Sequence, residues 1–137
     1  MLRFVAAILA YLVPTFILGF VWHLVLFKDY YEGLAMYRSD VIIPLGLLSM
    51  AIQSAIFAWL YSGTFAKRHD RFWVRTLAYG LLGAALSWSF TTLAVAAKNV
   101  MASVPDYLVI ETAFTIVQWV MVAPLTVLTF RRLAGRA

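Results

Sequence analysis

Two ionisable side chains, His23 and Glu111, lie within strongly apolar runs of the sequence. Ionisable groups in hydrocarbon are costly, and they usually face the interior of a helix bundle beside a partner. Both residues fall near the same predicted membrane boundary, so we predict that they pair. A carboxylate beside an imidazole favours the charged form of both groups.

This predicted pair has three interpretations. It is an ion pair that fixes the rotation of two helices, a proton or cation site, or part of a metal site. The third interpretation lacks a spacing motif such as H-E-x-x-H or paired cysteines, so we expect no metal and no other cofactor.

Helical spacing extends each member of the pair into a polar face. Thr15 and Gly19 precede His23 at intervals of 4 residues, and Thr115 and Gln118 follow Glu111 at intervals of 4 and 3 residues. Residues at these intervals share one side of a helix.

Gln53 and Gln118 each lie roughly 18 Å along a predicted helix, close to the centre of a bilayer. An unpaired amide there costs several kcal/mol, so we expect hydrogen bonds between helices, to each other or to Ser87. The alternative is a polar substrate site at the midplane. The candidate polar site therefore comprises His23, Glu111, Gln53, Gln118 and Ser87.

The sequence has few residues or motifs typical of enzymes. The chain has no cysteine, which excludes disulfides and thiol nucleophiles. It has no nucleophile with a neighbouring base, no Gly-rich phosphate loop and no paired catalytic carboxylates, and we therefore lean against an enzyme.

Composition indicates how these residues are positioned. Of the 137 residues, 64% are hydrophobic and only 12% are charged, which points to lipid as the solvent. Four apolar runs, at about residues 4–27, 41–65, 72–97 and 106–130, are long enough to cross a bilayer as helices. We predict a single all-α membrane domain over residues 1–137, a four-helix bundle.

The second and fourth runs resemble each other. Offset by 65 positions, QSAIFAWLYSGTF (53–65) and QWVMVAPLTVLTF (118–130) are identical at 5 of 13 positions. This favours two tandem helical hairpins related by an axis along the membrane normal. The alternative is convergence, because aromatic and basic residues mark the inner boundary of many spans.

Basic residues set the expected orientation. Of the 11 lysines and arginines, 8 lie at the N-terminus, the middle loop and the C-terminus, and 3 lie on the other side. The positive-inside rule then places both termini in the cytoplasm and the chain in the inner (plasma) membrane. The short middle loop offers little surface for nucleic acid, so we expect none as a partner.

The segment GFVWHLVLFKDYYEGL (19–34) resembles a family of small bacterial four-span membrane proteins with a domain of unknown function. That family shows a Gly-x-x-Trp-aromatic pattern followed by Phe and another aromatic residue. Gly19, Trp22, Phe27 and Tyr31 occupy those places, with His23 where tyrosine is more usual. The resemblance implies a four-helix membrane fold and a bacterial source, and it implies no activity.

Three classes of function fit these features. The first is a non-catalytic structural or accessory component of a membrane complex. The second is a small oligomeric transporter or channel with a polar site near His23 and Glu111. The third is a membrane enzyme that acts on lipid or quinone. The expected partners are the lipid bilayer and either further copies of the chain or another membrane protein.

Overall fold

A computed structural model of the protein describes residues 1–38, 40–67 and 71–132. Within these ranges the chain is helical and has no strand, which confirms the all-α prediction. Four helices are long and apolar enough to cross a membrane: Leu2–Leu26, Ile43–Phe65, Phe72–Ala96 and Val104–Arg131. Their ends lie within two residues of those expected from the sequence.

Each of the first three spans contains a π-helical segment. The elements run α1 (Leu2–Val21), η1 (Trp22–Leu26), α2 (Lys28–Gly33), α3 (Ile43–Leu60), η2 (Tyr61–Phe65), α4 (Phe72–Ser87), η3 (Trp88–Leu93), α5 (Ala94–Ala96) and α6 (Val104–Arg132). A π-turn adds a residue to the helical repeat and so rotates everything that follows it, and such turns are frequent at functional sites. η1 carries His23 and η3 begins directly after Ser87.

Proline takes two kinds of position in these helices. Pro44 lies in the first turn of α3, where its missing N–H costs nothing. Pro14 and Pro124 lie inside α1 and α6, where each removes one backbone hydrogen bond.

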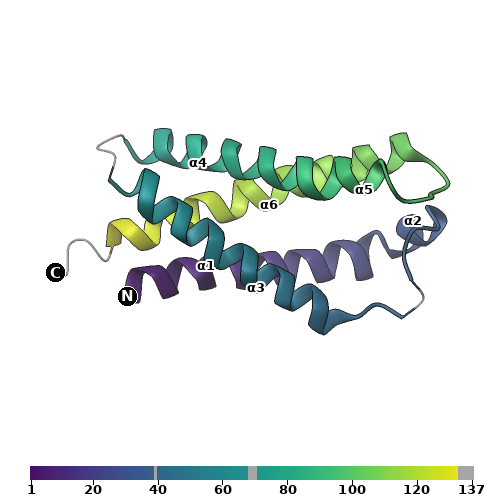
Figure 1. Ribbon diagram of the computed structural model, residues 1–137, viewed down its shortest axis with the longest axis horizontal. Coiled ribbons are helices and arrows are strands. Elements are labelled where there is room, and N and C mark those ends of the chain that lie inside the picture. The colour runs from purple at the N-terminus through teal and green to yellow at the C-terminus, as the bar shows by residue number, and fades with distance from the viewer. Residues whose placement is uncertain (39, 68–70, 133–137) are drawn as a thin grey trace.

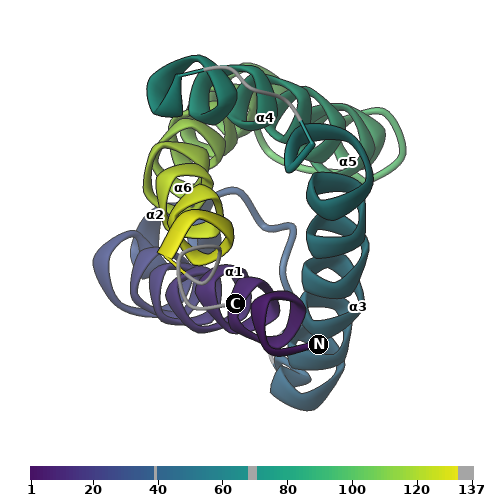
Figure 2. The same ribbon diagram turned by 90° about the vertical axis from the view of Figure 1, so that its left-hand side faces the viewer.

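The four spans form an uneven ring. α1 packs against both α3 and α6, and α6 packs against α4, whereas α4 meets the α3 span chiefly at η2 (Figure 2). Figure 1 shows the reason, because α3 crosses obliquely and moves away from α4 as it approaches Ile43. The start of α1 and the end of α6 lie at the same end of the bundle (Figure 1).

Aromatic rings fill the core. Trp119 of α6 lies at the centre, with ring centroids 4.8 Å from Phe57, 5.6 Å from Tyr79 and 5.8 Å from Tyr11. A separate cluster of Tyr31, Leu34, Tyr107 and Ile110 closes the end of the bundle that carries α2. We call this end the outer end and the opposite end the inner end. Offset and edge-to-face contacts between rings add to the free energy gained from burial.

The two predicted hairpins do not pack against each other symmetrically. Both hairpin pairs, α1 with α3 and α4 with α6, are packed together. A two-fold repeat also requires α3 and α4 to meet as α1 and α6 do, yet α1 packs along α6 while α3 diverges from α4. The tandem duplication stays a prediction.

Gly83 allows α4 to approach α6. A Cβ atom at this position would lie 2.0 Å from Cη2 of Trp119. The Trp119 indole therefore packs directly on the backbone of α4, the kind of contact that small residues provide between membrane helices.

We expect Gly83→Ala to lower the free energy of unfolding by about 1–3 kcal/mol, because the Trp119 ring must shift to admit the methyl group. Gly46→Ala is the matched control, since a Cβ there meets no atom within 4 Å. Thermal unfolding in mild detergent measures both. Equal unfolding temperatures for the two variants would contradict the close approach of α4 and α6.

Candidate functional site

His23 and Glu111 meet at the outer end of the bundle. Nε2 of His23 lies 3.1 Å from Oε1 of Glu111, and Nδ1 of His23 lies 2.9 Å from the carbonyl oxygen of Gly19. The pairing expected from their depth is therefore present. η1 and α6 supply the two side chains, which are 18% and 10% exposed.

Tyr31 is the third member of this group, and the sequence did not identify it as such. Its hydroxyl donates to the same Oε1 of Glu111 at 2.6 Å, and the residue is fully buried. We call His23, Tyr31 and Glu111 the outer triad. In the sequence Tyr31 stands out only through the family resemblance of residues 19–34, because the position of α2 over the bundle end depends on tertiary packing.

The hydrogen bonds restrict where protons lie in the outer triad. The Gly19 carbonyl can only accept, so Nδ1 of His23 must carry a proton. Nε2 then either donates to an ionised Glu111 or accepts from a protonated one. Either arrangement keeps one proton between His23 and Glu111, and the pair is electrically neutral overall.

Aromatic rings enclose the outer triad. Phe114 packs edge-on against the His23 ring at 4.6 Å, and Tyr37 stacks on Tyr31 with a centroid separation of 5.0 Å and an interplanar angle of 8°. Burial, followed by the nearby Glu111 carboxylate, raises the pKa of Tyr31 and of Tyr37. Both hydroxyls therefore stay protonated and available as donors at neutral pH.

The loop after α2 brings Tyr37 into place through an unusual backbone conformation. Ala35 has a φ of 55°, in the left-handed region that side chains other than glycine seldom adopt. A neighbouring backbone bond, from Ala102 N–H to the Leu34 carbonyl at 2.9 Å, fastens this loop to the one that precedes α6. Such conformations cost about 1–3 kcal/mol and are found most often where surrounding contacts hold them in place.

Charged side chains at this end are paired locally. Lys28 lies 3.1 Å from Glu32, and the Arg38 guanidinium donates to both carboxylate oxygens of Asp40. The Arg38 bond holds the pKa of Asp40 below its usual value. Both pairs are exposed, so their contribution to stability is small.

A second polar group lies near the midplane and is centred on Tyr11. The amide nitrogen of Gln118 donates to the Tyr11 hydroxyl at 3.0 Å, and that hydroxyl donates to Oε1 of Gln53 at 3.2 Å. The two glutamines are thus bridged by tyrosine. Tyr11 lies one turn before Thr15 on the predicted face of Thr15, Gly19 and His23. The helical spacing of that face could therefore have identified Tyr11 as a member.

Ser87 does not join this network. It accepts a hydrogen bond from Nε1 of Trp119 at 3.1 Å, which corrects the expected bond between a glutamine and Ser87. The oblique course of α3 explains the difference, because Gln53 turns toward α1 and bonds Ser49 on its own helix. Gln53 and Ser87 still line one hollow of about 210 Å³ between α3 and α4.

The polar faces of α1 and α6 meet in a continuous seam. Gln118 contacts Thr15 at 3.4 Å as well as Tyr11, Thr115 bonds back to the Glu111 carbonyl, and the outer triad closes the far end. We call this buried line of polar residues the α1–α6 seam. Both faces were predicted from spacing, and the structure shows that they face each other.

The seam offers donors and acceptors but little reactive chemistry. Among residues 1–38, 40–67 and 71–132, no three His, Asp or Glu side chains gather as a metal site would require. Comparison with protein-family models, with curated proteins and with solved structures finds no match to this chain.

We expect Tyr31→Phe to lower the free energy of unfolding by about 1.5–3 kcal/mol, because it removes a buried hydrogen bond to the Glu111 carboxylate. The adjacent Tyr30→Phe is the matched control, since its hydroxyl makes only an exposed contact of 3.5 Å with the Asp106 carbonyl. Thermal unfolding in detergent or nanodiscs compares them. If the two variants were equally stable, Tyr31 would not be a member of the triad.

Proposed function

We propose that this chain is a non-catalytic accessory component of a membrane complex. The observation that carries the proposal is the α1–α6 seam, whose polar side chains are committed to one another. His23 and Tyr31 both bond Glu111, and Gln118 and Gln53 both bond Tyr11. Groups so arranged stabilise a bundle, whereas an enzyme or carrier must present polar groups to a substrate.

The shape of the bundle supports a partner. Residues 41–49, which include the first two turns of α3, are all exposed. A helix so poorly covered by its own chain has apolar surface that either lipid or another membrane protein must cover. We propose that α3 faces the partner on its α4 side, where the two helices diverge.

We further propose a multi-pass location in a bacterial inner membrane with both termini in the cytoplasm. The support is the distribution of basic residues, 8 against 3. The common end shared by the start of α1 and the end of α6 agrees with this orientation (Figure 1). The family resemblance of residues 19–34 stays a prediction.

A small oligomeric transporter is the second candidate. The hollow between α3 and α4 carries Gln53, Ser87 and Thr91, and a second copy of the chain could close it into a pathway. Against this, three hollows within the spans are each lined chiefly by two neighbouring helices of the described chain. A membrane enzyme has less support, because the protons of the outer triad are already committed within it.

The orientation predicts a labelling pattern. The chain has no cysteine, so single cysteines can be introduced at Leu2 and Val100, which are 71% and 93% exposed. In intact cells a membrane-impermeant maleimide should label Val100→Cys and should label Leu2→Cys only after permeabilisation. The reverse pattern would overturn the proposed orientation.

The accessory role predicts stable partners and no intrinsic flux. The full chain, purified from its native membrane in mild detergent, should retain defined membrane proteins after crosslinking and mass spectrometry. Ile52→Trp on the exposed side of α3 should weaken that association at least tenfold, whereas Val109→Trp on α6 should not.

Flux measurements separate the accessory role from transport. Proteoliposomes containing the purified chain should leak protons no faster than empty vesicles, and His23→Ala should change nothing. Purification without partners, together with pH-dependent uptake that His23→Ala abolishes, would contradict the accessory role and favour the transporter.

A further inference from the structure

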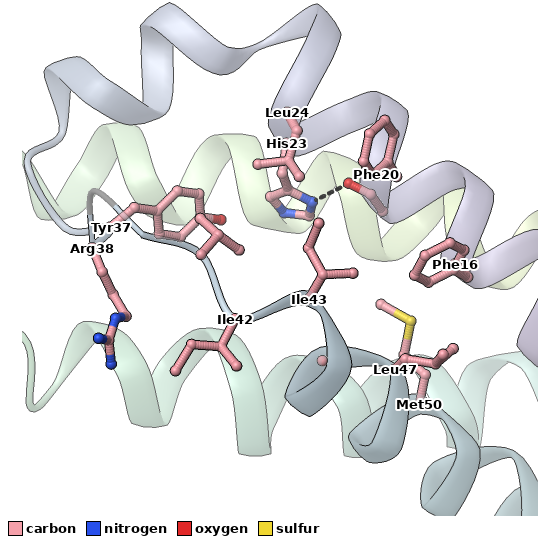
Figure 3. Close-up of a pocket in the computed structure, with 13 residues that line it drawn as sticks. Phe16, Phe20, His23, Leu24, Tyr37, Arg38, Ile42, Ile43, Leu47 and Met50 are labelled. Carbon is pink, nitrogen blue, oxygen red and sulfur yellow. Dashed lines mark hydrogen bonds between the residues drawn. The ribbon is translucent and has the colours of Figure 1, made fainter.

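A deep apolar hollow separates the outer half of α1 from the outer half of α3. We call it the outer cleft. It measures about 270 Å³, close to the lower end of the roughly 300–1,000 Å³ typical of small-molecule sites. Figure 3 shows Phe16 and Phe20 on one wall, Ile43, Leu47 and Met50 on the other, and His23 at the outer end.

A polar hollow of about 350 Å³ lies beside the outer cleft at the level of the loops. The two hollows share His23, Tyr37 and Arg38 in their linings. Polarity therefore changes between neighbouring hollows, from hydrocarbon walls within the span to Lys28 and Glu32 at the loops. That gradient matches a ligand with a polar head and a long apolar chain.

The charges around the polar hollow disfavour an anionic head. Both basic side chains of its lining are paired, Lys28 with Glu32 and Arg38 with Asp40. These two pairs together hold two basic and two acidic residues, a formal charge of 2 − 2 = 0. A phosphate would have to displace a carboxylate from one of these pairs, whereas a neutral head would not.

Tyr37 offers a hydrogen-bond donor and an aromatic ring to a ligand with a neutral head group. Its hydroxyl makes no hydrogen bond within the part of the chain that the structure describes. One face of its ring stacks on Tyr31, and the residue lines both hollows with 38% of its surface exposed. Figure 3 shows the ring lying beside His23, whose two ring nitrogens are already hydrogen-bonded to Gly19 and Glu111.

We propose that this space binds an isoprenoid quinone, which combines a flat neutral ring, carbonyl acceptors and an apolar chain. The Tyr37 hydroxyl donates to a quinone carbonyl, and the quinone ring lies against the aromatic side chains that line the outer cleft. The isoprenoid chain enters sideways from the outer leaflet and lies between α1 and α3. This inference goes beyond the accessory role and does not depend on it.

The test uses the full chain in nanodiscs of dioleoylphosphatidylcholine, titrated with decylubiquinone. Binding is followed by saturable quenching of tryptophan fluorescence and by the rise in unfolding temperature that a ligand of the folded state produces. Dioleoylglycerol and dioleoylphosphatidylglycerol are the comparison ligands, one neutral without a ring and one anionic. Saturable binding of decylubiquinone alone is the expected result.

Two variants locate the site. Gly46→Leu fills the outer cleft and should weaken binding at least tenfold, while folding is preserved because a Cβ at position 46 meets nothing within 4 Å. Gly63→Leu is the matched control, since that glycine is equally open but lies at the inner end of the same span. Tyr37→Phe, which removes only the hydroxyl, should weaken binding by about 2- to 10-fold.

Three outcomes would overturn the proposal. They are non-saturable quenching identical to that of empty nanodiscs, equal binding of either comparison lipid, and unchanged binding in both Gly46→Leu and Tyr37→Phe. If Gly46→Leu proved unstable, Tyr37→Phe would decide alone. Loss of quinone binding would leave the copurifying partners in place, so this inference and the accessory role fail independently.

Discussion

Hydrocarbon cannot solvate a polar side chain, so every such group in a span must find its partner inside the protein. In this chain the requirement is met largely along one line, where α1 and α6 meet. Glu111 is hydrogen-bonded to both His23 and Tyr31, and Tyr11 joins Gln118 to Gln53. The seam fixes how α1 and α6 are rotated about their own axes. Tyr31 belongs to α2 and Gln53 belongs to α3. The seam therefore also draws these two helices toward α1 and α6, with α2 at one end of the seam and α3 at the other.

The remaining helices are held by shape more than by hydrogen bonds. Gly83 lets Trp119 lie against the backbone of α4, and the ring of Trp119 then reaches Phe57, Tyr79 and Tyr11. Side chains from all four spans thus meet around one indole. α3 joins this cluster through its inner half. One hollow lies between the outer half of α3 and α1, and another lies on the α4 side, against Gln53, Phe57 and Leu60. The two proposals concern these two spaces, a protein partner on the α4 side and a quinone on the α1 side.

At the outer end, the side chains of the outer triad make hydrogen bonds with one another, whereas the nearby Tyr37 hydroxyl makes none within the described residues. Within the triad each proton has a donor and an acceptor, which suits a structural role. One ring away, Tyr37 stacks on Tyr31 and lines the hollow, and its hydroxyl makes no hydrogen bond within the described residues. The strained Ala35 lies two residues before it. A rigid, preorganised aromatic donor of this kind lowers the entropic cost of binding a ligand.

The sequence by itself determined which residues form the four apolar spans and how far along each span they lie. Hydropathy and helix length set the four spans to within two residues, and equal depth was enough to pair His23 with Glu111. Tertiary structure decided which helix faces which, since depth along the membrane normal contains no information about rotation or neighbour order. Tyr31 entered the triad because α2 folds back over the bundle end, Tyr11 bridged the glutamines because α3 leans toward α1, and Ser87 bonded Trp119 because Gly83 admits that ring to α4. These are packing relations between segments far apart in the chain, and the residue spacing within a single helix cannot specify them.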